Sequence, residues 1–201
     1  MIRVLVADAN ELIRNAIAGR LDIEDDIEVT GRAADGRAAV EVAMARHPDV
    51  AVVDLAMPEL DGLAFLAELA RTLPSCAVVI LAARGGPGYL KRALAAGAKG
   101  FLPKDGPGAK LADVIRRVHA GGRYVDPTLA ADALTAPDCP FTPRQLEVLR
   151  LAEHDTPVAV IANRTNLSVG TVRKYLAAAV RKLGVKNRAE ACRTARENGW
   201  L

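Results

Sequence analysis

The first 120 residues alternate short apolar runs with segments of helical periodicity, and this alternation restricts the folds open to the chain. The expected strands are Ile2–Ala7, Ile27–Gly31, Val50–Val53, Ala77–Leu81 and Gly100–Leu102. The expected helices are Glu11–Leu21, Arg37–Arg46, Leu63–Leu73, Tyr89–Ala96 and Ala109–Ala120. Five strands that alternate with five helices predict an α/β domain, in which a five-stranded parallel sheet is covered by helices on both faces.

The rest of the chain has a different character. Residues 121–139 read as a linker with one short helix near Leu129–Leu134, because Gly121, Gly122 and several prolines interrupt any longer periodicity. No strand pattern follows Phe141, and four helical segments are expected. They are Pro143–Glu153, Val158–Arg164, Val169–Leu183 and Arg188–Asn198. We therefore expect two domains, residues 1–120 and an all-α four-helix domain at residues 140–201.

Charge is distributed unevenly between these two parts. Residues 140–201 carry 11 Lys and Arg against 5 Asp and Glu, whereas the other residues carry 16 against 19. A basic segment attached to a mildly acidic body favours a nucleic-acid-binding module. No apolar run approaches the roughly 20 residues of a membrane span, and no signal peptide is evident, so we expect a cytoplasmic protein without membrane contact. The three cysteines lack metal-ligand spacing.

Polar residues stand where the expected strands end. In a parallel α/β sheet, ligands bind beyond the carboxyl ends of the strands, which directs attention to Asp8, Asp54, Ala82 and Lys104. A carboxylate in such a place can attack a phosphoryl donor and form an acyl phosphate. Mg²⁺ prefers oxygen ligands, and a lysine supplies a point positive charge to phosphoryl oxygens.

The string from Asp54 through Met57, Pro58 and Asp61 to Gly62, followed at the proper distance by Lys104, resembles the receiver domain of response regulators. The resemblance covers about the first 120 residues. It implies that Asp54 is the phosphoacceptor, that Lys104 contacts the phosphoryl group and that Phe101 is the aromatic switch residue. It also implies Mg²⁺ as cofactor, held by Asp8, Asp54 and the backbone carbonyl of Ala56.

Two positions depart from the receiver pattern. Receivers have two adjacent acidic residues after the first strand, but here Ala9 follows Asp8, and the missing second acid is normally the direct metal ligand. Ala82 stands where the family has a Ser or Thr hydroxyl, and Asn10 is an alternative source of an oxygen ligand. Two hypotheses remain open for Asp54: it accepts phosphate, or it is a leftover carboxylate that pairs with Lys104.

The segment Val169–Leu183 separates into two faces when it is drawn as a helix. Val172, Leu176, Val180 and Leu183 fall in one apolar stripe, and Ser168 is a natural N-cap. The opposite face holds Gly170, Arg173, Lys174, Ala177 and Arg181. A helix that enters the major groove of DNA needs packing behind it and donors in front. Arg173 and Lys174 can reach guanine edges or phosphates, and Ala177 a thymine methyl.

Residues 140–201 also resemble the LuxR/FixJ-type helix-turn-helix. The resemblance rests on Phe141–Arg144, Glu147–Leu149, Ile161-Ala162, Leu167–Tyr175, Lys182–Val185 and Asn187-Arg188. It implies DNA contacts by Ser168, Thr171, Arg173, Lys174, Ala177 and Arg181. The chain departs from the pattern at Asp155, usually glycine, at Pro157–Val160, usually Ser-Asn-x-Glu, and at Thr165, usually leucine.

Together the two resemblances identify the chain as a member of the NarL/FixJ class of response regulators. Pro87–Leu90 and Asn198–Leu201 are similar to the actinobacterial DesR-like branch. The class implies a two-component transcription regulator whose phosphorylated form dimerises on a pseudo-palindromic operator, with a histidine kinase as partner. The alternative is a degenerate receiver controlled by a protein partner, a ligand or constitutive dimerisation. An enzyme is disfavoured, because a phosphohydrolase needs a second acid two residues after its nucleophilic aspartate. Two residues after Asp54 stands Ala56, and two residues after Asp8 stands Asn10, so neither aspartate has this second acid.

Overall fold

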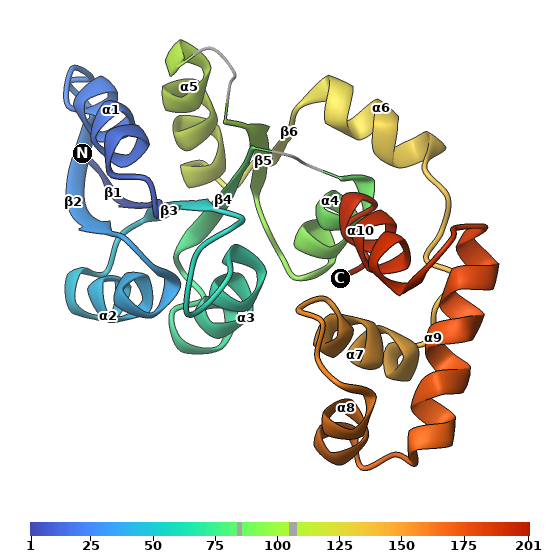
Figure 1. Cartoon of the computed structure of the whole chain (residues 1–201). Coiled ribbons are helices and arrows are strands. Elements are labelled where there is room, and N and C mark those ends of the chain that lie inside the picture. Colours follow the sequence, from blue (N-terminus) through green and yellow to red (C-terminus); the bar gives the residue numbers. More distant parts are fainter. Residues whose placement is uncertain (84–85, 105–107) are drawn as a thin grey trace. The chain divides into compact units, whose positions relative to one another are not determined.

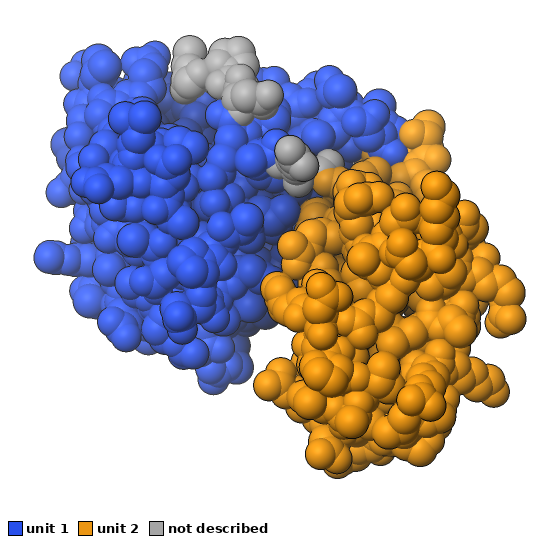
Figure 2. All heavy atoms as spheres, viewed as in Figure 1, with its two compact units in different colours: residues 1–85, 90–132 blue, residues 86–89, 133–201 orange. Residues whose placement is uncertain are grey.

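The computed structural model describes residues 1–83, 86–104 and 108–201 (Figure 1). The chain forms two compact units (Figure 2). The first unit consists of residues 1–85 and 90–132, and the second of residues 86–89 and 133–201. Within the ranges that the structure describes, no helix is both long enough and apolar enough to cross a membrane.

The first unit is built on one parallel sheet. Its strands are β1 (Ile2–Ala7), β2 (Ile27–Ala33), β3 (Val50–Asp54), β4 (Ala77–Ala82), β5 (Gly100–Pro103) and β6 (Tyr124–Val125). They lie in the order β2-β1-β3-β4-β5-β6 and every pair is parallel. All five residues of β3 are buried, as expected for a strand covered on both faces.

The parallel α/β architecture is confirmed, but the expected number of strands was one short. Strand β6 pairs with β5, with Tyr124 opposite Gly100 and Val125 opposite Phe101. It falls in the stretch expected to be a linker. Two residues are too few to establish a strand periodicity, so only pairing with β5 identifies them as a strand.

Helices alternate with these strands along the chain. They are α1 (Glu11–Leu21), α2 (Gly36–Arg46), α3 (Gly62–Thr72), α4 (Pro87–Ala95) and α5 (Gly108–His119). Helix α1 packs with α5 on one face, and α2 packs with α3 on the other (Figure 1). Asn10, Asp35 and Asp61 cap α1, α2 and α3, because each side chain accepts hydrogen bonds from backbone N–H groups of the first turn.

Helix α6 (Pro127–Thr135) precedes the four helices of the second unit, which are α7 (Pro143–Ala152), α8 (Val158–Thr165), α9 (Val169–Leu183) and α10 (Arg188–Glu197). Their apolar faces form one core, in which Phe141 and Trp200 meet edge to face with ring centroids 5.9 Å apart. Thr142 begins α7 with a capping box, in which its side chain and that of Gln145 each accept a hydrogen bond from the other's backbone N–H.

Candidate functional site

Three charged side chains meet at the carboxyl edge of the sheet. Asp8 follows β1, Asp54 ends β3 and Lys104 follows β5. The Lys104 Nζ atom lies 2.7 Å from Asp8 Oδ2 and 2.7 Å from Asp54 Oδ2. Only 1% of the Asp8 side chain and 7% of the Asp54 side chain are exposed. One partly buried ammonium therefore serves two buried carboxylates.

The charges of this trio do not balance. Burial by itself would lower the pKa of the Lys104 ammonium, but hydrogen bonds and charge interactions with Asp54 and Asp8 outweigh that effect and raise the pKa. Lys104 is therefore charged at neutral pH, and by formal charge the trio has one ammonium for two carboxylates. A further negative charge would have to compete with Asp8 for Lys104.

The loop after β3 holds Asp54 in place. The Ala56 N–H donates to Asp54 Oδ1 at 3.1 Å, and the Gly62 N–H donates to the Leu55 carbonyl at 3.0 Å. A Cβ atom on Gly62 would lie 2.6 Å from the Asp54 carbonyl oxygen, so only glycine allows this close approach. The Asp61 side chain then begins α3 by accepting from the Ala64 N–H. The spacing of Asp54, Asp61 and Gly62 in this loop thus serves to position Asp54.

The positions that depart from the receiver pattern offer no replacement oxygen. Asn10 Oδ1 accepts from the N–H groups of Leu12 and Ile13, so it is occupied as the N-cap of α1. Ala82 is buried at the end of β4 and has only a methyl group. Sequence reasoning missed Arg14, whose guanidinium donates to the Asp8 carbonyl at 2.6 Å. Phe101 is fully buried.

The donor set fits Mg²⁺ poorly. Mg²⁺ requires close to octahedral oxygen coordination, and the two carboxylates present already contact Lys104. In the part of the chain that the structure describes, no three His, Cys, Asp or Glu side chains are arranged to hold a metal ion. The side chain at position 9, an alanine methyl, provides no further ligand.

In the second unit, α9 presents one packed face and one exposed basic face. Val172, Leu176 and Ala179 are buried, and Val180 and Leu183 pack partly buried against the same core. The buried stripe of α9 is therefore shifted slightly from the expected apolar stripe, because it includes Ala179. On the other side, Arg173, Lys174, Ala177 and Arg181 are exposed. Among the described residues, none of these three basic side chains has an ion-pair partner.

The start of α9 is held by two hydroxyls. Ser168 Oγ accepts from the Thr171 N–H at 3.1 Å and lies 2.9 Å from Thr171 Oγ1. Both residues thus fix the first turn of the helix on which the basic side chains stand. The N-terminal end of the helix, with its partial positive charge, remains accessible beside this pair.

The unusual residues before α9 are accommodated locally. Thr165 is buried, and its hydroxyl donates to the Ile161 carbonyl at 2.7 Å. Asp155 adopts a φ of 53°, a conformation that favours glycine, and its carboxylate contacts Arg188 at 3.3 Å. Pro157 stands at the N-cap of α8, as expected for a helix start. These departures leave the helix-turn-helix geometry of α8 and α9 in place.

Two family models match the chain. Residues 4–116 match the response regulator receiver domain. Residues 139–195 match the bacterial regulatory proteins of the luxR family. The two matches correspond to the parts that carry the carboxylate trio and the basic helix.

Other proteins are similar to this chain over its whole length. The chain is 38% identical over 201 residues to the transcriptional regulatory protein DesR of Bacillus subtilis, covering 100% of both chains. It is 37% identical to the response regulator RamR of Streptomyces coelicolor, covering 100% of this chain and 98% of that one. Among solved structures, the response regulator ChrA of a heme-sensing two-component system is 30% identical, with a TM-score of 0.60 and coverage of 100% and 98%.

Proposed function

This chain belongs to the NarL/FixJ family of response regulators, which join a receiver domain to a LuxR-type DNA-binding domain, and from that premise we propose how its two sites work. Helix α9 reads operator DNA, and Asp54 accepts the phosphoryl group that controls binding. The proposed division is a receiver at residues 1–120, a linker at 121–139 and the DNA-binding domain at 140–201. The role is regulatory rather than catalytic.

The observation that carries this proposal is the exposed basic face of α9. Arg173, Lys174 and Arg181 are exposed, while the opposite side of the helix is packed into the core. In a helix-turn-helix domain, such a helix lies in the major groove. We assign base contacts to Arg173 and Lys174, a thymine methyl contact to Ala177 and phosphate contacts to Arg181, Ser168 and Thr171.

Gel-shift titration on an operator selected from genomic DNA tests the assignment. Replacing Arg173 or Lys174 by alanine should cost about 1–3 kcal/mol of binding free energy if the residue reads a base. Arg181→Ala should weaken binding to all sequences alike and reduce its salt dependence. Arg193→Ala, which removes an exposed charge from α10, is the matched control. Unchanged affinity in the double variant Arg173→Ala, Lys174→Ala would contradict the proposal.

At the receiver site we propose nucleophilic attack by Asp54. A carboxylate oxygen forms a bond to the phosphorus of the donor, the bond from phosphorus to the leaving group breaks, and the leaving group keeps that electron pair. Lys104, 2.7 Å from Asp54 Oδ2, places its charge beside the incoming phosphoryl oxygens. The proposed donor is the phosphohistidine of a partner kinase.

Mg²⁺ is the usual cofactor of receiver domains, and when bound it offsets the charge of the phosphoryl group. Asp8, Asp54 and the Ala56 carbonyl are the groups that could approach it here. Because Ala9 supplies no carboxylate and Lys104 already contacts both aspartates, we infer weak Mg²⁺ binding and slow phosphorylation. Lys104 then supplies most of the positive charge at this site.

We further propose that two copies act together. One recognition helix reads only a few base pairs, so useful specificity requires two half-sites about one helical turn apart on a pseudo-palindrome. A homodimer matches that symmetry. Because its target is chromosomal DNA, the protein would act in the cytoplasm.

A further inference from the structure

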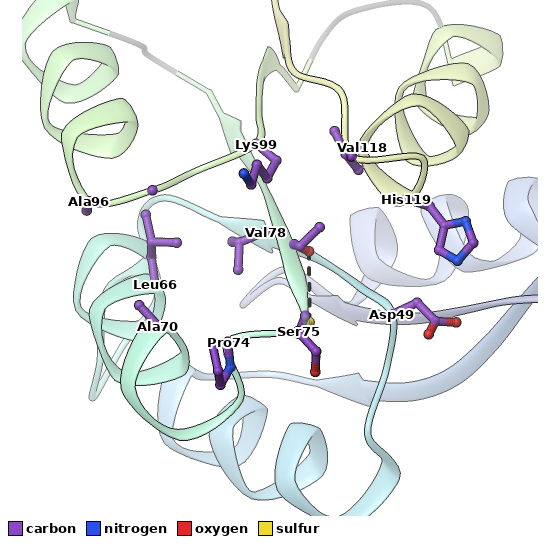
Figure 3. Close-up of a pocket in the computed structure, with 14 residues that line it drawn as sticks. Asp49, Leu66, Ala70, Pro74, Ser75, Val78, Ala96, Lys99, Val118 and His119 are labelled. Atoms are coloured by element: carbon purple, nitrogen blue, oxygen red, sulfur yellow. Dashed lines mark hydrogen bonds between the residues drawn. The ribbon is translucent and has the colours of Figure 1, made fainter.

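The first unit contains a cavity of about 420 Å³ (Figure 3). It lies at the edge of the sheet opposite to the one where β3 ends in Asp54. It opens where β4 and β5 begin, since Cys76 and Lys99 immediately precede these strands. The C-terminal ends of α3, α4 and α5 surround it. A pocket of this volume is in the range of small-molecule sites, and neither the phosphoryl site nor the DNA-binding face uses it.

One part of the cavity wall is apolar. Leu66 and Ala70 of α3, Val78 of β4 and Val118 of α5 line it, and Leu66, Val78 and Val118 are almost entirely buried. Figure 3 shows Leu66 and Val78 beside the same space as Lys99. The wall therefore favours a ring or a short aliphatic chain, because burying its apolar surface is favourable.

Lys99 gives this apolar cavity a specific charge. Its side chain is half-buried in the lining, and it has no ion pair with any other residue in the described ranges. Asp49 also belongs to the lining, and its Oδ2 atom accepts a hydrogen bond from the Arg3 N–H at 2.8 Å. His119 lines another part of the cavity and is exposed.

We propose that this cavity binds a small amphipathic carboxylate, with its carboxylate on the Lys99 ammonium and its apolar body against Leu66, Val78 and Val118. An organic cation would be repelled by Lys99. A neutral molecule of the same shape would leave the ammonium of the half-buried Lys99 without a partner, which is unfavourable. An inorganic anion would leave the apolar wall uncovered.

Isothermal titration of the full chain with 2-naphthoate tests this inference, with 2-naphthalenemethanol as the uncharged probe of matched shape. Wild type should bind the carboxylate at least about tenfold more tightly than the alcohol, as expected for one charge-assisted hydrogen bond. Lys99→Met should remove that preference and Lys99→Arg should retain it. Ala70→Phe, which fills the cavity, should abolish binding of both probes, and Lys186→Met, in the other unit, should change nothing.

Cys76 provides a second readout inside the cavity. Its thiol lines the wall and is buried, so 2-naphthoate should slow its alkylation by iodoacetamide but not that of the exposed Cys139. Two results would overturn the inference: no binding by a folded wild-type chain, or equal binding by wild type and a folded Lys99→Met variant. Either result would leave the gel-shift outcome untouched, so this inference and the proposed function fail separately.

Discussion

At the scale of single residues, the trio of Asp8, Asp54 and Lys104 lets us predict how removing a charge changes stability. With one ammonium for two buried carboxylates, Asp8→Asn should stabilise the first unit by about 1 kcal/mol, the usual size of a favourable charge substitution. Lys104→Met should destabilise it by about 3–5 kcal/mol, because it leaves buried carboxylates unpaired.

Urea unfolding at neutral pH measures both changes. The double variant Asp8→Asn, Lys104→Met should be more stable than Lys104→Met alone, since it removes one of the two unpaired charges. If Asp8→Asn instead destabilised the unit as strongly as Lys104→Met does, the geometry of the contacts and not the excess negative charge would determine the effect of the trio on stability.

Cys76 makes the stability of the first unit sensitive to alkaline pH. Burial, and secondarily the charge of Asp49, raises the pKa of this thiol to about 12. The folded pKa lies above the ordinary thiol value, so the unfolded chain loses this proton first as pH rises. The buried, protonated thiol therefore contributes stability that is fully present below the thiol pKa of the unfolded chain. This stability falls as pH rises from the pKa of the unfolded chain to that of the folded chain, and it is gone above about 12.

Thermal melts of wild type and Cys76→Ala between pH 8 and pH 10.5 check this dependence. The alanine variant should lose less stability than wild type across that range. Lysines and tyrosines also titrate in this pH range. Because wild type and Cys76→Ala share all of these residues, the difference between their curves reports on Cys76. Parallel curves for the two proteins would show that Cys76 has no such role.

At the scale of elements, the first turn of α9 depends on Ser168. Its hydroxyl caps the helix through the Thr171 N–H, and removal of such a cap costs about 1 kcal/mol. Ser168→Ala should therefore lower the stability of the second unit by that amount, and Ser168→Asn should retain most of it. Circular dichroism during denaturation provides the measurement, and an alanine variant as stable as wild type would refute the capping role.

Helix α9 also shows how much of a structure a local sequence pattern can predict. The periodicity of Val169–Leu183 predicted a helix and its basic face, because side-chain direction follows from 3.6 residues per turn. It did not predict that Ala179 would be buried more fully than Val180. That difference depends on which neighbouring helices contact α9, and small residues are buried where helices approach closely.

At the scale of the whole molecule, the altered receiver site should change how phosphate controls assembly. Phosphate can shift a dimerisation equilibrium only by its differential contacts with the two states. Ala9 and Ala82 remove two such contacts, so wild type should be labelled slowly by acetyl phosphate and should dimerise partly without it. The double variant Ala9→Asp, Ala82→Thr should be labelled faster and depend more strongly on phosphate.

Intact mass after acetyl phosphate with Mg²⁺, alongside analytical sedimentation, follows both properties. Asp54→Asn is the control that should take no label. Rapid stoichiometric labelling of wild type, together with a strictly monomeric unlabelled form, is the outcome that this prediction forbids.

The sequence by itself determined the parallel α/β unit, the helical unit after it and the family, because alternating periodicity and motif spacing are properties of neighbouring residues. It also selected Asp8, Asp54 and Lys104 as residues at strand ends. Only the tertiary structure decided that Lys104 contacts both aspartates, that Asn10 is occupied as a helix cap and that Tyr124-Val125 extends the sheet. Each of these outcomes depends on groups distant in sequence that compete for one partner, or on an edge strand that exists only through pairing. The cavity beside Lys99 arises in the same way, from three helix ends and two strand starts that no local pattern relates.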